Sequence, residues 1–109
     1  MSEESNAQIR RLLQEFEHKV VDINKRKIRE IAGEINEDDF LKMAELIAVC
    51  RARYLKAVLQ ISSTGEEFLD DHINDSLQQH RRSYLEAMQG FNALRHALER
   101  GYVVLNTDQ

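Results

Sequence analysis

The spacing of Glu15 and His18 is the feature of this sequence that comes nearest to a metal site. A Glu-x-x-His motif sets a carboxylate and an imidazole on one helical face, and diiron helical bundles combine two such motifs with two further inward-facing glutamates. The chain contains no second Glu-x-x-His, and its other histidines, His72, His80 and His96, are scattered. We therefore interpret Glu15 and His18 as a solvated surface pair, and we predict no metal site and no cofactor.

Nucleophilic catalysis finds equally little support. Cys50 is the single cysteine, and it falls in a strongly apolar helical segment, where a thiol is normally structural rather than reactive. There is no Gly-x-Ser-x-Gly nucleophile elbow. The glycines are isolated and do not gather in a phosphate-binding loop: Gly33, Gly65, Gly90 and Gly101. We predict that the protein is not an enzyme.

Two polar positions interrupt otherwise apolar helical faces. Arg51 projects from the apolar face of a helix, and His80, with Ser76 nearby, lies in the apolar face of the next one. A guanidinium in such a place must be paired or must reach water, because an unpaired buried charge is very costly. We predict that Arg51, Ser76 and His80 form a buried polar layer that fixes the register of the helices. The alternative is a ligand pocket for a carboxylate or a phosphate.

A basic cluster offers a second kind of chemistry. Four cationic side chains lie within five positions: Lys25, Arg26, Lys27 and Arg29. Such a cluster can contact phosphates, and it suggests a nucleic-acid-binding regulator as an alternative function. The chain as a whole carries 15 Lys+Arg against 19 Asp+Glu, a net charge of −4, and Glu30 and Glu34 follow the cluster at helical spacing. We therefore favour a solvated face with ion pairs along the helix.

Long helices must position these residues, because the chain contains no proline and nothing else breaks a helix by ring geometry. Two segments carry helix-ending and helix-starting signals. In the first, Gly33 ends one helix and Asn36 caps the next; in the second, a capping box begins at Ser63 or Thr64. These signals predict helices over about 5–33, 37–61 and 65–100, with a short tail over 101–109 that either ends at Gly101 or adds one more helical turn.

The apolar faces of these helices predict how they assemble. Between Phe40 and Ile61, 16 of 22 residues are apolar, which is typical of a central helix covered on several sides. The third helix repeats apolar positions at heptad spacing, in two rows: Ile73, His80, Ala87 and Leu94, and Leu77, Tyr84, Phe91 and Leu98. This spacing favours a left-handed bundle or coiled coil. We predict a single all-α domain over 1–109, an antiparallel three-helix bundle with long helices.

The first helix carries an apolar stripe that changes course. It runs through Ile9, Leu13, Phe16, Val20 and Ile23, and then skips by one residue to Ile28, Ile31 and Ile35. The skip crosses the polar stretch 24–27. It indicates a stutter, a kink or an early helix end there.

The sequence shows no sign of secretion, of a membrane span or of internal disulfides. The acidic start of the chain has no apolar core of a signal peptide, and no stretch of about 18 uncharged apolar residues exists to span a membrane. A lone cysteine excludes an internal disulfide framework. We expect a cytoplasmic protein without a membrane segment.

The third predicted helix is longer than the second, so its end is left with an apolar overhang. Such a patch usually marks a partner surface, and we predict that the chain assembles as a homodimer through it. The expected interface residues are Tyr84, Met88, Phe91, Leu94, Leu98 and Tyr102. The predicted function is that of a small non-enzymatic helical interaction protein (an adaptor, a chaperone-like subunit or a regulator) that binds a protein partner or itself. Metal or small-ligand binding in the bundle core is a further alternative.

Overall fold

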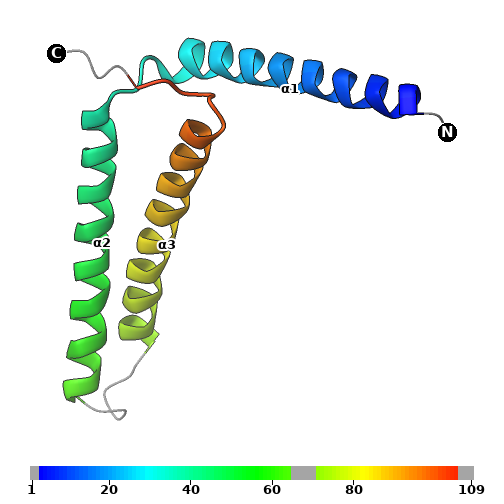
Figure 1. Cartoon of the computed structure of the whole chain (residues 1–109). Coiled ribbons are helices and arrows are strands. Elements are labelled where there is room, and N and C mark those ends of the chain that lie inside the picture. Colours follow the sequence, from blue (N-terminus) through cyan, green and yellow to red (C-terminus); the bar gives the residue numbers. More distant parts are fainter. Residues whose placement is uncertain (1–2, 65–70, 106–109) are drawn as a thin grey trace. The chain divides into compact units, whose positions relative to one another are not determined.

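The computed structural model describes residues 3–64 and 71–105, and over these residues it contains three helices and no strand (Figure 1). The helices are α1 (Glu3–Ala32), α2 (Glu37–Thr64) and α3 (Asp71–Glu99). The predicted all-α class is therefore confirmed. The chain divides into two compact units, one made of Met1–Asn36 with His96–Gln109 and the other of Glu37–Arg95.

Helix α1 runs without interruption through the polar stretch 24–27, so the skip in its apolar stripe is not an early helix end. The side-chain Nδ2 of Asn24 donates a hydrogen bond of 2.8 Å to the backbone carbonyl of Val20, one turn earlier. The helix ends at Gly33, as predicted. Gly33 has a φ of 85° and donates its backbone N–H to the carbonyl of Arg29 over 3.1 Å, which is the αL form of a helix C-cap.

Helix α3 ends in a Schellman motif, so the tail does not extend the helix. Gly101 has a φ of 78°, its N–H donates to the carbonyl of Leu98 over 3.1 Å, and the N–H of Tyr102 donates to the carbonyl of Ala97 over 2.8 Å. These two bonds satisfy carbonyls that a helix end otherwise leaves open. They also turn the chain away from the helix axis, and Gly101 comes to lie against Val21 of α1.

Gly90 lies inside helix α3, whereas Gly101 has a left-handed backbone, so replacing each by alanine should change stability in opposite directions. We expect Gly101→Ala to lower the free energy of unfolding by about 1–2 kcal/mol, because an L-residue in the left-handed region is strained. We expect Gly90→Ala to raise it by about 0.5–1 kcal/mol, because glycine weakens a helix interior. A Cβ at Gly90 would lie 3.5 Å from Met43 Cε and one at Gly101 3.9 Å from Val21 Cγ1, so neither meets a clash. Urea denaturation followed by circular dichroism measures both changes, and shifts in the same direction would contradict this account.

The start of α2 agrees with its prediction. Three acidic residues, Glu37, Asp38 and Asp39, occupy its first turn, where the helix dipole favours negative charge. Lys42 Nζ lies 3.1 Å from Asp38 Oδ2, and the hydrogen bond and charge of Asp38 raise the pKa of Lys42 above its usual value of 10.5. The helix continues to Thr64, three residues beyond the predicted end. The predicted start of the next helix near 65 lies outside the described residues.

Helices α2 and α3 pack against each other through aromatic side chains (Figure 1, green against yellow and orange). Phe40 meets Phe91 edge to face with ring centroids 6.1 Å apart, and Tyr54 stacks on Tyr84, also at 6.1 Å. The contacting residues follow opposite orders along the two helices. Ile47 and Cys50 are buried, and Ile47 shares the face of α2 that carries Phe40 and Tyr54.

The residues of α3 that the heptad repeat singled out are also half-buried ones. All eight, from Ile73 to Leu98, are neither fully exposed nor fully buried. Tyr84 and Phe91 meet aromatic rings of α2, and Gly90, next to Phe91, lies close to Met43 of the same helix. The repeat therefore identified which face of α3 packs.

The first unit has a small packing centre of its own. Val103 is buried, and Val21, Asn24 and Ile28 form a half-buried face of α1, with Val21 facing the Gly101 turn. This face lies about 90° around the helix from the stripe that begins at Ile9, by the 100° rotation per residue of an α-helix. After the skip, Ile28 therefore lies on this second face, whereas Ile31 is 85% exposed.

Candidate interaction surfaces

The predicted dimer interface on α3 has partners within the chain. Its six residues are all half-buried: Tyr84, Met88, Phe91, Leu94, Leu98 and Tyr102. Tyr84 and Phe91 contact aromatic rings of α2, and the ring of Tyr102 meets His96 edge to face at 6.5 Å. Helical periodicity identified an apolar face, but it does not say whether a helix of the same chain or of another covers that face. The role of these residues between chains stays a prediction.

The predicted polar layer is not buried within the single chain. Arg51 and Ser76 are exposed and His80 is half-buried. Arg51 instead donates a hydrogen bond of 3.2 Å from Nε to the Tyr84 hydroxyl, and its guanidinium carbon lies 5.4 Å from the centroid of that ring. Because Tyr84 also stacks on Tyr54, these three side chains link α2 to α3 at a solvent-accessible edge. Sequence reasoning found Arg51 but not Tyr84 as its partner.

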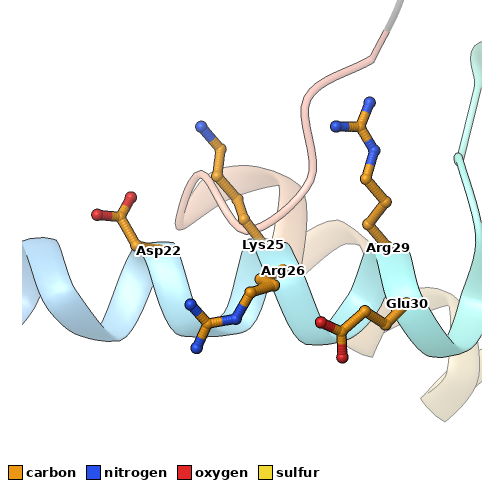
Figure 2. Close-up of a pocket in the computed structure, with 5 residues that line it drawn as sticks. All are labelled: Asp22, Lys25, Arg26, Arg29 and Glu30. Carbon is orange, nitrogen blue, oxygen red and sulfur yellow. The ribbon is translucent and has the colours of Figure 1, made fainter.

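The basic cluster of α1 lines a shallow hollow that is open to solvent (Figure 2). Five side chains line it: Asp22, Lys25, Arg26, Arg29 and Glu30. Figure 2 shows Lys25 and Arg29 extending to one side of the helix, and Arg26 and Glu30 to the other. All the lining residues come from a single helix, and its cations point to two different sides of that helix.

Two members of this cluster are engaged with carboxylates. Lys27 Nζ lies 3.2 Å from Glu30 Oε2, and Arg29 Nη2 lies 3.0 Å from Glu34 Oε1. Both pairs are well exposed, and exposed pairs of this kind contribute little to stability, about 0–1 kcal/mol. They do reduce the positive charge that the cluster offers to a phosphate. The favoured interpretation of the cluster as an ion-paired face agrees with these contacts.

A long stripe on α1 contains most of the exposed large apolar side chains of the first unit. Six large apolar side chains are each between 43% and 57% exposed, and we call them the α1 stripe: Ile9, Leu12, Leu13, Phe16, Val20 and Ile23. Helix α1 contains no buried residue at all. An isolated exposed leucine needs no explanation, but a continuous row of this length does.

Helix α2 also presents apolar side chains to solvent. Only Ile47 and Cys50 of its described residues are buried, whereas Leu41, Leu55 and Leu59 are exposed. The sequence led us to expect a central helix covered on several sides. The α2–α3 contacts account for one side of this helix.

Chemical sites of other kinds are not apparent in the described part of the chain. Over residues 3–64 and 71–105, no three His, Cys, Asp or Glu side chains are grouped so that they could hold a metal ion. Over the same residues, none of the helices combines the length and the apolar character needed to cross a bilayer. Comparisons of the chain with protein-family models, curated proteins and solved structures gave no match.

Proposed function

We propose that this chain is a small non-enzymatic interaction protein that binds a protein partner, or a second copy of itself, through an exposed apolar helical surface. The α1 stripe is the observation that carries the proposal. Its six side chains are each about half exposed, and no described residue of the first unit buries them. Burying one large apolar side chain completely contributes about 1.5–3 kcal/mol, so covering the stripe is a strong driving force for association.

The arrangement of polar residues fits this role. Charged side chains flank the stripe on α1, with Arg10 on one edge and Lys19 on the other. An apolar centre with a charged rim is the usual anatomy of a protein interface, in which the apolar part supplies affinity and the charges set orientation. The basic cluster supports nucleic-acid binding less well, because its cations point to two sides of one helix and two of them are paired with carboxylates.

Site-specific photo-crosslinking in the protein's native cells tests the proposal. A photoreactive amino acid placed at Phe16 lies in the middle of the α1 stripe, and one placed at His18 lies on the opposite side of the same helix. We expect position 16 to crosslink to protein, either another chain or a second copy of this one, several times more strongly than position 18. Phe16→Asp, combined with a photoreactive residue at Leu13, should reduce crosslinking to the level of the His18 control.

The same experiment identifies the failure of the proposal. Equal crosslinking from positions 16 and 18 would show that the stripe has no special role in binding. Crosslinking to nucleic acid in place of protein would favour the basic cluster and overturn the proposal.

A further inference from the structure

We propose that the α1 stripe pairs with the α1 stripe of a second copy of this chain, with the two helices running in opposite directions. This inference rests on the proposed interaction function and names its partner. It places the contact between chains on α1, not on the face of α3 that contacts α2.

The spacing of the stripe fits a helical partner of the same repeat. Ile9, Leu13, Phe16, Val20 and Ile23 follow one another at alternating steps of four and three residues, the seam spacing of two helices that pack knobs into holes. The seam residues occupy the first (a) and fourth (d) positions of a seven-residue repeat, with Leu13 and Val20 at a positions and Ile9 and Phe16 at d positions. In an antiparallel pair, an a position of one helix faces a d position of the other. Leu13 then faces Phe16 of the second copy, and Val20 faces Ile9. In this register four large apolar side chains of each copy face one another across the seam, Ile9, Leu13, Phe16 and Val20, while Ile23 faces Asn6 of the second copy.

The charged residues that follow the stripe favour antiparallel over parallel pairing of the two α1 helices. The next two seam positions after Ile23 are Lys27 and Glu30, which form an ion pair of 3.2 Å on the helix surface. A parallel pair would place Lys27 against Lys27 and Glu30 against Glu30 of the second copy, and such like-charge contacts are destabilising. In the antiparallel register, both residues lie beyond the apolar seam of the other helix and stay in water.

The flanking charges are complementary in the same direction. Arg10 and Glu17 occupy the same edge of the seam, seven residues apart, and both are exposed. In the antiparallel register Arg10 of each copy faces Glu17 of the other, so two symmetry-related ion pairs form. In a parallel pair this edge faces the opposite edge, which carries Leu12 and Lys19, and Arg10 does not meet Glu17. Charges that flank a helical seam set partner choice and orientation.

Analytical ultracentrifugation of the purified full chain in reducing buffer tests the pairing. We expect a concentration-dependent monomer–dimer equilibrium for the natural sequence and only monomer for Phe16→Asp. The matched control is His18→Asp, which introduces the same group on the opposite side of α1 and should leave the equilibrium unchanged. Circular dichroism of each variant checks that it remains helical.

Charge reversal tests the direction. Arg10→Glu and Glu17→Arg should each raise the dissociation constant of the dimer by about tenfold or more, because two attractive pairs become repulsive. The two single variants mixed together should associate again, since position 10 of each chain then faces an opposite charge at position 17 of the other. The double variant R10E/E17R should likewise regain the affinity of the natural sequence.

Each result has one meaning. A natural chain that stays monomeric up to its solubility limit overturns the self-pairing, and so does a dimer that survives Phe16→Asp. A mixture of the two charge variants that remains monomeric overturns the antiparallel register. Photo-crosslinking from position 16 to other proteins only would leave the proposed function standing while this inference fails.

Discussion

Replacement of Ile47 by aspartate is expected to lower the free energy of unfolding of the α2–α3 unit by about 3 kcal/mol or more. Ile47 is 9% exposed and shares the face of α2 that carries Phe40 and Tyr54. The change removes apolar contacts and places a carboxylate where it has neither water nor a partner. Urea denaturation followed by circular dichroism gives the change in free energy.

Leu46→Asp is the matched control for this prediction. Leu46 precedes Ile47 on the same helix but is 51% exposed, so its aspartate stays hydrated. We expect a loss of about 1 kcal/mol or less, which reflects mainly the weaker helix propensity of aspartate. Equal losses at the two positions would show that the face of α2 identified by Ile47 is not the packing face.

Val103→Asp is expected to release the C-terminal turn from α1, at a cost of about 2–3 kcal/mol for the lost apolar burial and the new charge. Val103 is 7% exposed, and the turn that precedes it contacts Val21. Amide hydrogen exchange measured by NMR is the most direct readout. The N–H groups of Tyr102 and Val103 both donate to the carbonyl of Ala97, and their protection should fall sharply.

The neighbouring residue again provides the comparison. Val104 is 69% exposed, so Val104→Asp should leave the protection of Tyr102 and Val103 nearly unchanged. If both substitutions expose these amides equally, the turn is held by its backbone hydrogen bonds alone and the burial of Val103 contributes nothing to it.

The end of α1 at Gly33 was predicted correctly, the end at Gly101 was one of two alternatives, and the end of α2 lies three residues beyond its predicted position. Gly33 and Gly101 both lie where a left-handed backbone closes a helix, and glycine is the residue that adopts this conformation without strain. Signals of this kind depend on a single residue and its immediate neighbours. They are therefore readable without knowledge of the tertiary structure.

Packing partners could not be predicted in the same way. The apolar side chains of α2 extend around much of the helix, so periodicity alone does not single out the face that meets α3. Periodicity predicts Arg51 at the centre of an apolar face, whereas the structure places it at an exposed edge within reach of Tyr84. A residue long enough to reach around a helix can take a partner that no pattern in its own helix indicates.

The polar stretch 24–27 illustrates a related limit. A one-residue skip in an apolar stripe has the same appearance whether a helix bends or simply presents a second face to another segment. Only the position of the C-terminal turn beside Val21 distinguishes the two, and that turn lies at the far end of the sequence.

The contact between Val21 and Gly101 also bears on how the chain folds as it is made. The α2–α3 unit is one continuous segment, Glu37–Arg95, whereas the other unit joins the first residues of the chain to the last ones. Contacts between residues distant in sequence form more slowly because a long loop must close first. During synthesis, α1 therefore leaves the ribosome long before the residues that pack on Val21 exist, and the α2–α3 segment completes its contacts earlier.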